Sequence, residues 1–491
     1  MSGATPHVLP LSPLSPLSAA ATQWRGRVLM LGFGSIGQAM LPLLLGRLGI
    51  TPERIAILTA CERGAEQAAA AGISRTLLPL TRENMAQTLD ERLAPGDLLL
   101  NLAVNVSSVD VSQYCMSIGA HYLDTSVEPW AGGYVDPRLP YIERCNFGLR
   151  RLLTAAIQRH PAPAPTALIG CGANPGLVSL FVKRALLSLL ASRADLARPE
   201  PTQQGEWADL ARALGVKVVH ITERDTQATA APLRTGELAN TWSIGSLLGE
   251  AYLPSELAFG THEPLLPADA HYHDGPACGS VYLERPGALN RTRSWLPQGG
   301  QFGGCIISHP ETLSIAEYLT SVDGDARVVH RPTVLFAYRP CDSAMLALLD
   351  IAGNDFRTGD LTTRVIVEEV SRGEDQLGVL LMGQPGRAFW FGSQLRATDA
   401  QRLAPHNNAT SLQVCAGVLA GIVWLLEHPA QGLCEPEAID VHQGLEVAAP
   451  YLGDLSGVWT KWTPTRRRFL ALPDVLDRTE PWAFSNFRLG G

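Results

Sequence analysis

The first third of the chain alternates short apolar runs with segments whose apolar residues recur every three or four positions. The runs are typical of buried strands and lie at 27–31, 54–58, 97–102 and 122–124. The recurring segments have the spacing of amphipathic helices and lie at 39–48, 65–71 and 109–118. Strands that alternate with helices in this way predict an α/β fold with a doubly wound parallel sheet of the Rossmann type.

The pattern becomes less regular after a Pro- and Ala-rich stretch at 161–165. Later apolar runs predict strands of a separate sheet, at 217–222, 328–336, 363–370 and 377–382. Helices are expected over 177–190 and 412–426, and the sequence leaves open which domain the second helix packs against. We therefore predict a Rossmann domain over 26–165 and an α+β domain over 166–491.

The first 25 residues lack the basic start and long apolar run of a signal peptide, so a disordered tail is expected. Two segments imitate membrane spans. Residues 28–46 carry no charge but contain the glycines of a strand–turn–helix unit, and 414–426 is shorter than the roughly 20 residues of a span. Both are expected to be buried core, which predicts no membrane partner.

Composition narrows the class further. The 491 residues are 46% hydrophobic and 18% charged, which is typical of a globular protein. A formal net charge of −8 argues against a nucleic-acid partner, since such partners select basic patches. The nine cysteines are odd in number and contain no C-x-x-C pair, so reduced thiols in a cytoplasmic protein are expected.

A glycine-rich turn joins the first predicted strand to the first predicted helix, as a dinucleotide-binding fingerprint requires. Its glycines permit a tight turn, backbone approach to a pyrophosphate and close helix–strand packing, and the helix start offers N–H groups to the anion. The candidate cofactor residues of this turn are Gly32, Gly34, Ser35, Ile36 and Gly37.

The end of the second predicted strand is atypical for such a site. Thr59 stands where an acidic residue is expected to bind the adenosine ribose. A small polar residue with Arg63 nearby is the pattern for a 2′-phosphate, which would select NADP. Alternatively, Glu62 reaches the ribose hydroxyls and the cofactor is NAD.

Acidic and aromatic residues follow several predicted strands. Thr125, a further candidate for cofactor binding, and Glu128 follow the strand at 122–124, at the carboxyl edge where ligands bind in such sheets. Trp242 precedes Glu250 by two helical turns, and a tryptophan face attracts an alkylammonium while a carboxylate pairs with it. Glu223 closes the strand at 217–222. Acids and an aromatic with few basic groups fit a dicationic substrate.

Three further polar residues have weaker signals. Asn174 is expected to cap the helix at 177–190, with Pro175 in its first turn. His309 follows a short apolar run and titrates in the range useful for proton transfer. Asp375 is expected in an ordinary hairpin loop before the strand at 377–382. The pair His271 and His273 lacks a third ligand at suitable spacing, so no metal site is predicted.

Taken together, these strings resemble the bacterial homospermidine synthases, from residue 28 to residue 482 and in the family's order. The matching strings are Gly32 to Gly37, Glu128 to Trp130, Gly172 to Gly176, Glu223 to Gln227, Asn240 to Ser243, Phe391 to Leu395, Asn408 to Thr410 and Pro450 to Gly453. The resemblance implies an architecture like that of saccharopine dehydrogenases, with a dinucleotide-binding domain and a substrate-binding α+β domain that forms a homodimer.

The resemblance also implies a reaction and its partners, which are diamines and polyamines. Tightly held NAD accepts hydride from putrescine to give an imine, and a second amine, putrescine or spermidine, attacks it. Ammonia leaves, and NADH reduces the new Schiff base to homospermidine. Trp242 would hold the cationic intermediate and the glutamates would pair with ammonium groups. Asn174, His309 and Asp375 would line the reacting end or the entrance.

Two positions depart from the family pattern. The family carries acids where this chain has Thr59 and Asn105, both assigned to the cofactor side of the site. Two other functions stay open. A related saccharopine or carboxynorspermidine dehydrogenase would need arginines for a carboxylated substrate. A non-catalytic nucleotide-binding regulator would have little use for Glu128, Trp242 and His309 together.

Overall fold

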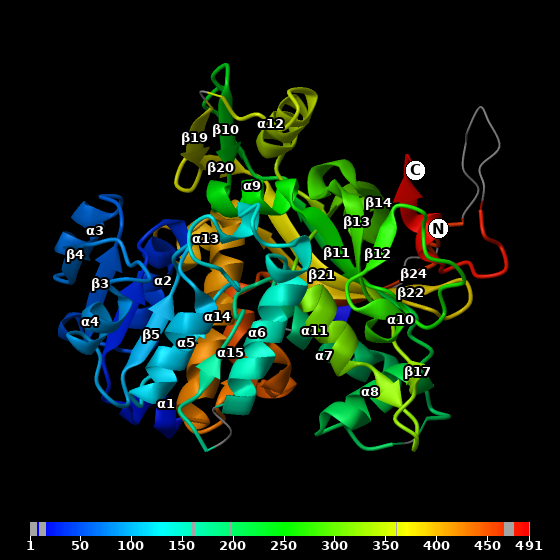
Figure 1. Ribbon diagram of the computed structural model, residues 1–491, viewed down its shortest axis with the longest axis horizontal. Coiled ribbons are helices and arrows are strands. Elements are labelled where there is room, and N and C mark those ends of the chain that lie inside the picture. Colours follow the sequence, from blue (N-terminus) through cyan, green and yellow to red (C-terminus); the bar gives the residue numbers. More distant parts are fainter. Residues whose placement is uncertain are drawn as a thin grey trace.

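The computed structural model describes residues 7–8, 16–159, 163–196, 198–359, 361–465 and 476–490. Two sheets lie side by side, with helices on and between them (Figure 1). The first sheet is on the left of that view, while both ends of the chain lie on the right, beside the second sheet. Part of the predicted hinge, at 161–162, falls outside the described residues.

The first sheet has seven parallel strands in the order β23-β7-β6-β5-β2-β3-β4. They are β2 (Val28–Leu31), β3 (Ile55–Thr59), β4 (Ser74–Leu77), β5 (Leu98–Asn101), β6 (His121–Asp124), β7 (Ala167–Leu168) and β23 (Leu433–Cys434). Chain order reverses at β2, and this reversal opens a crevice at the carboxyl ends of the strands. The predicted Rossmann-type fold is confirmed.

Helices connect and cover these strands. They are α2 (Ser35–Gly46), α3 (Ala65–Ala70), α4 (Met85–Asp90), α5 (Ser108–Ser117) and α6 (Asn146–Arg159). The sheet itself extends past residue 165, because β7 and the distant β23 complete its edge. The chain therefore leaves the first sheet after β7 and returns to it near its C-terminus.

The second sheet is mixed and has twelve strands, with β8 (Val218–Asp225) near its centre. β8 pairs in parallel with β18 (Thr333–Arg339) and antiparallel with β21 (Glu374–Met382). The remaining strands on the main path are β1 (His7–Val8), β24 (Asp454–Thr460), β22 (Ala388–Arg396), β11 (Pro254–Ala258), β13 (Ser280–Pro286) and β12 (Ala270–Tyr272). Strands β14 (Arg291–Leu296) and β15 (Gly300–Ile307) form a branch from β18.

Two single strands predicted from sequence are each divided in the structure. The run at 328–336 forms β17 (Val328–His330) and β18, with Pro332 between them, which lacks the N–H that a ladder needs. The run at 363–370 forms β19 (Thr362–Val365) and β20 (Val370–Arg372). These two strands pair with different partners, β10 (Glu237–Asn240) and β9 (Ala228–Thr229), in the part that projects at the top of Figure 1.

The helix that sequence left unassigned, α14 (Ala409–Glu427), contacts both domains. It packs on α2, β6 and β7 of the first domain and on β21 and β22 of the second. It is also longer than predicted, and it is long and apolar enough to cross a membrane. However, 94% of its apolar window is buried inside the protein, so burial rather than length identifies it as core.

The predicted disorder of residues 1–25 is wrong for two segments. β1 (His7–Val8) pairs with β24, and α1 (Ala19–Gln23) packs on α14. The Ser18 side chain caps α1, and the Trp24 indole donates to the Gly96 carbonyl at 3.1 Å. Arg54 lies 5.0 Å over the Trp24 ring. These contacts give the segment a fixed place that its composition does not indicate.

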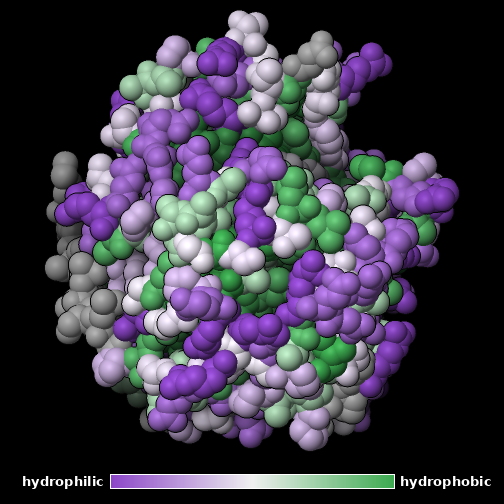
Figure 2. All heavy atoms as spheres, turned by 90° about the vertical axis from the view of Figure 1, so that its left-hand side faces the viewer, coloured by the Kyte–Doolittle hydropathy of each residue, from purple (hydrophilic) through white to green (hydrophobic). Residues whose placement is uncertain are grey.

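The face of the first domain is mostly hydrophilic, and hydrophobic residues show mainly in the hollows between polar ones (Figure 2). Apolar surface is instead buried around the sheet and α14. Phe33, Met30 and Met40 are among the largest fully buried side chains of the protein.

Close packing of α14 gives a stability prediction. A Cβ at Gly417 would lie 1.9 Å from the Gly172 carbonyl oxygen, so Gly417→Ala should lower the free energy of unfolding by about 1–3 kcal/mol. Gly205→Ala in α8 (Gln204–Ala213) meets no atom within 4 Å and should be neutral or stabilising. Thermal unfolding of both variants measures this. Equal melting temperatures for the two would show that α14 does not need this close approach.

Candidate active site

The glycine-rich turn has the geometry of a pyrophosphate cradle. Gly32 has φ +87°, and a Cβ there would lie 2.8 Å from the Ala103 amide nitrogen. A Cβ at Gly37 would lie 2.8 Å from the Gly32 carbonyl oxygen, whereas one at Gly34 meets nothing within 4 Å. The N-cap residue of α2 is Gly34, and no side chain among the described residues caps the start of this helix. These residues fit a dinucleotide bound at the reversal of the sheet.

The ribose corner is formed by the ends of β3 and β4. Thr59 is buried, and its hydroxyl accepts a 3.5 Å hydrogen bond from the Cys61 amide. Arg75, on β4, holds the Glu62 carboxylate at 2.9 Å and donates to the Cys61 carbonyl at 2.5 Å. Glu62 is 72% exposed and so retains acceptor capacity for a ligand. The residue that orients Glu62 is thus Arg75.

Glu128 lies where the chain leaves β6, near Thr125 at the same edge. Its backbone N–H donates to the Ser108 hydroxyl at 3.0 Å, and the Ser108 N–H donates to its carbonyl at 2.9 Å. The Asn105 amide approaches its carboxylate at 3.4 Å from a left-handed φ of +62°, which asparagine tolerates. Burial, with the charge of Glu250, raises the pKa of Glu128 to about 7.

Glu223 accepts a 2.6 Å hydrogen bond from the Asn174 side-chain amide. The prediction that Asn174 caps a helix is therefore wrong. The helix α7 (Leu177–Ala191) begins where it was predicted, but its N-cap residue is Gly176, with a φ of +128°, and the Asn174 side chain instead reaches Glu223 on β8. Burial, with Asp225 nearby, raises the pKa of Glu223 to about 8.

Asp375 does not lie in a hairpin loop as predicted. It belongs to β21, directly opposite Asp225 of β8, and is fully buried. One carboxylate oxygen accepts from the Thr410 hydroxyl of α14 at 2.5 Å, and the other has no hydrogen-bond partner among the described residues. Burial and the nearby carboxylates raise the pKa of Asp375 well above its ordinary value.

Asp225 accepts hydrogen bonds on both of its carboxylate oxygens, whereas Asp375 accepts one on a single oxygen. Its oxygens accept from the Thr241 hydroxyl at 2.6 Å and from the Gln227 amide N–H at 2.8 Å. Burial raises its pKa to about 6. Gln227 in turn donates to Thr410 at 3.0 Å, so the start of α14 links both aspartates.

His309 is held between two carboxylates. Its Nε2 lies 3.2 Å from Glu250, and its Nδ1 lies 3.1 Å from Glu311. Burial opposes the charged imidazole, but the two carboxylates outweigh burial and raise the pKa of His309 well above its ordinary value. The two carboxylates therefore stabilise the charged form of the imidazole.

Trp242 lies just before α9 (Ile244–Tyr252), the helix that carries Glu250. Its indole N–H donates to the Tyr338 hydroxyl at 2.9 Å. Tyr338, on β18, is paired in register with Glu223 on β8. The structure therefore brings Trp242 to the neighbourhood of the buried carboxylates.

Five buried or largely buried carboxylates share this region: Glu128, Glu223, Asp225, Glu250 and Asp375. Within the described ranges no lysine or arginine forms an ion pair with any of them, and His309 is their basic neighbour. Buried negative charge without compensation is costly. The site is therefore suited to a ligand that brings positive charge.

Sequence reasoning missed three residues of this region. Asp225 is one of the five carboxylates, and Glu311 and Tyr338 lie beside them. Asp225 follows Glu223 by two positions in a strand, so the twofold alternation places both on one face and was an available signal. Tyr338 gave no such signal, because β18 and β8 are more than a hundred residues apart in the sequence.

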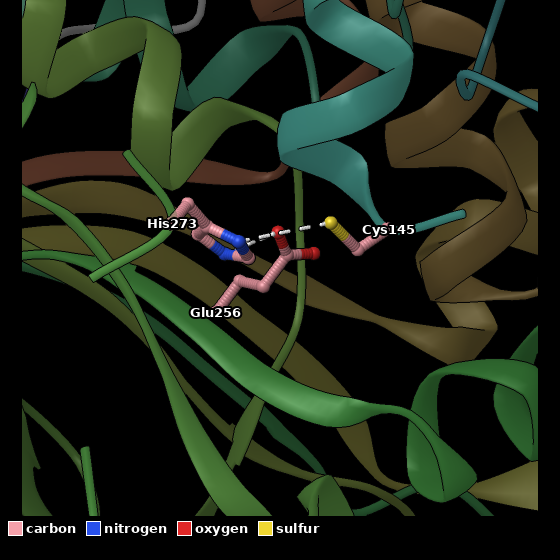
Figure 3. A group of neighbouring side chains, drawn as sticks. All are labelled: Cys145, Glu256 and His273. Carbon is pink, nitrogen blue, oxygen red and sulfur yellow. Dashed lines mark hydrogen bonds and ion pairs between the residues drawn. The ribbon is translucent and has the colours of Figure 1, made fainter. Parts of the chain in front are cut away.

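A separate group with donor atoms close enough for a metal ion consists of Cys145, Glu256 and His273 (Figure 3). Both Glu256 oxygens already accept hydrogen bonds from the first N–H groups of α6, at 2.8 and 3.0 Å, and His273 lies 3.1 Å away. Ser308 adds a hydroxyl at 2.7 Å. We assign the group a structural role, because it fixes the start of α6 on β11. The neighbouring His271 points elsewhere and pairs with Glu284.

Comparison with known proteins defines the class first. Residues 28–166 match the saccharopine dehydrogenase NADP binding domain, and residues 172–459 match the saccharopine dehydrogenase C-terminal domain. The fold and site are accordingly those of a dinucleotide-binding protein of the saccharopine dehydrogenase class.

Full-length relatives then specify the family. Homospermidine synthase of Blastochloris viridis is 41% identical over 94% of this chain and 97% of its own length. That of Mesorhizobium japonicum is 39% identical over 94% and 96%. The crystal structure of homospermidine synthase from Legionella pneumophila, in complex with NAD, has a TM-score of 0.88 at 38% identity and covers 95% of this chain and 98% of its own. The chain belongs to the homospermidine synthase family.

The contacts of His309 with Glu250 and Glu311 predict that the stability of the fold depends on pH. Because its folded-state pKa is raised, its ion pairs stabilise the protein fully below the unfolded value of about 6.5, and this stabilisation is lost as pH rises through the folded-state pKa. Glu311→Gln should lower the His309 pKa in an NMR titration. It should also destabilise the fold most near pH ~6 and less at higher pH.

Glu284→Gln is the matched control, since it removes the partner of His271 from a largely exposed pair. It should change stability little at any pH. A His309 signal that titrates identically in the wild type and in Glu311→Gln would show that Glu311 does not raise the pKa of His309.

Proposed function

We propose that the protein is an NAD-dependent homospermidine synthase, which moves the aminobutyl group of one putrescine to a second amine. The observation that carries the proposal is the group of buried carboxylates beside Trp242, with no arginine or lysine paired to them in the described part of the chain. Family membership and the dinucleotide cradle support the same reaction.

The bound cofactor supplies the chemistry of hydride acceptance and return. The side chains must hold a dication and remove one proton from it, because an ammonium carbon cannot release hydride. A carboxylate such as Glu223 suits this step, since burial raises its pKa to about 8 and so makes its ionised form a stronger base than an exposed carboxylate. His309, between Glu250 and Glu311, supplies or receives protons as ammonia leaves.

Trp242 suits the other requirement, which is to hold the positive charge that forms on the imine. A cation over an indole face gains about 0.5–2 kcal/mol, more when it is desolvated. Glu128, near Asn105 at the edge of the first sheet, offers an anchor for the remote ammonium group. Carboxylated substrates of the alternative dehydrogenases would meet repulsion from the same acids.

We further propose NAD as the cofactor, bound with the ribose hydroxyls on Glu62. Arg75 holds this glutamate at the place where Thr59 supplies no acid. A 2′-phosphate would be repelled by the Glu62 carboxylate. The relative from Legionella pneumophila was solved with NAD, which favours the same choice.

We also propose a cytoplasmic homodimer without nucleic-acid or membrane partners. All nine cysteines lie in the described residues and are free thiols, which suits a reducing compartment. Leu346 and Leu349 are exposed on one side of α12 (Asp342–Gly353) and offer an apolar contact surface. The formal net charge of −8 disfavours nucleic acid.

The reaction is tested by incubating the protein with putrescine and NAD and resolving the polyamines by mass. Homospermidine and ammonia should form in equal amounts without net NADH. Glu250→Gln should lower kcat/KM by at least ~10-fold, as expected when a charged partner of a buried cation is lost. Glu446→Gln, an acid outside the site, is the control. Net NADH production, or no homospermidine, would overturn the proposal.

Cofactor choice is tested separately. Glu62→Gln should weaken NAD binding by about 10-fold, the worth of one hydrogen bond to a charged group, and should narrow the preference over NADP. Glu66→Gln, an exposed acid in α3, should change neither affinity. Binding is measured by calorimetry with each nucleotide. Unchanged NAD affinity in Glu62→Gln would remove this residue from the ribose site.

A further inference from the structure

Four ring side chains form a row next to the buried carboxylates of the site. Trp242 lies against Tyr338, Tyr338 stacks on Phe336, and Phe336 contacts the His309 imidazole. The centroid distances along this row are 6.5, 5.3 and 4.7 Å. Phe336 and Tyr338 are alternate residues of β18 and therefore share one face of the sheet. The row therefore connects Trp242 with His309, two residues of the proposed site.

Tyr338 is also joined to Trp242 by a hydrogen bond. It accepts the Trp242 indole N–H at 2.9 Å. Tyr338 itself is about 1% exposed and fixed within the centre of the second sheet, between β8 and β15. Trp242, by contrast, is only partly buried and lies in the short turn between β10 and α9. The hydrogen bond thus joins a turn residue to a buried residue that is paired with strands on both sides.

Orientation of Trp242 matters because cation–π attraction is directional. The attraction acts over the ring face and is lost when the ring edge is presented. An indole has two soft side-chain torsions, and a hydrogen bond from Nε1 fixes the ring about both of them. The tyrosine hydroxyl provides this acceptor without adding a charge that would compete with the substrate cation.

We propose that Tyr338 is a positioning residue for the reaction. Its hydroxyl holds the Trp242 indole with its face toward the cationic carbon chain of the substrate. The inference rests on the proposed function for its substrate, but the hydrogen bond itself can be observed without turnover. Tyr338 acts through Trp242 and takes no part in proton transfer.

The test is a double-mutant cycle on the full-length protein with NAD bound, using Tyr338→Phe and Trp242→Phe. Tyr338→Phe keeps the ring and removes the acceptor, and should lower kcat/KM for putrescine about 10-fold, mostly through KM. Trp242→Phe should lower it at least as much. The double variant should match Trp242→Phe, because Tyr338 then has no indole to hold.

Tyr252→Phe is the matched control. Its hydroxyl makes no hydrogen bond with the described residues, so its removal should leave kcat/KM and NAD affinity unchanged. Additive losses in the cycle would overturn the proposal, since Tyr338 would then act independently of Trp242. Wild-type activity in Tyr338→Phe would overturn it as well.

A spectroscopic readout separates this proposal from the proposed function. The Trp242 indole resonance, assigned by its loss in Trp242→Phe, should move upfield in Tyr338→Phe without any substrate. In the unmutated protein the same N–H should exchange slowly with solvent, which does not depend on a variant folding. Fast exchange would overturn the positioning role even if homospermidine forms. Slow exchange without homospermidine would leave the hydrogen bond intact and reject only the substrate.

Discussion

The burial of several carboxylates with one basic neighbour is the constraint on which the site depends. Each acid is expensive to desolvate, and the protein meets the cost only in part, through hydroxyl and amide donors such as Thr241 and Asn174. The pKa values of Glu128 and Glu223 rise to about 7 and 8 as a result. In the proposed function a cationic substrate completes the charge balance, and the same uncompensated carboxylates bind the substrate and accept its proton.

This arrangement needs a rigid frame, and α14 supplies much of it. Its N-cap Asn408 donates to the Thr241 carbonyl at 2.6 Å and to the Ile366 carbonyl at 2.9 Å, which fixes the turn ahead of Trp242. Two residues later, the Thr410 hydroxyl donates to Asp375. The same helix packs on α2, whose first turn forms the cofactor cradle. A single buried helix thus joins the substrate side to the nucleotide side.

The two sheets position different residues of the site. The parallel sheet places Gly34 and Glu128 at its carboxyl edge, where every strand ends on the same side. The mixed sheet places Glu223, Asp225 and Asp375 on adjacent strands, where register alone decides that they meet. Rigid strands keep these acids close despite their repulsion, which mobile loops would not do.

The sequence by itself determined the elements whose signals are local. Apolar periodicity identified the Rossmann strands and helices, and the spacing of Gly32, Gly34 and Gly37 identified the cradle, because each depends on neighbours within a few residues. The family strings indicated Trp242, and the resemblance that they carry implied a role for His309. The contact of Asn174 with Glu223, the burial of Asp375 in β21 and the path of α14 between the sheets were decided only by tertiary structure. So was the contact between Tyr338 and Trp242, since pairing between strands distant in the chain leaves no periodic trace in sequence.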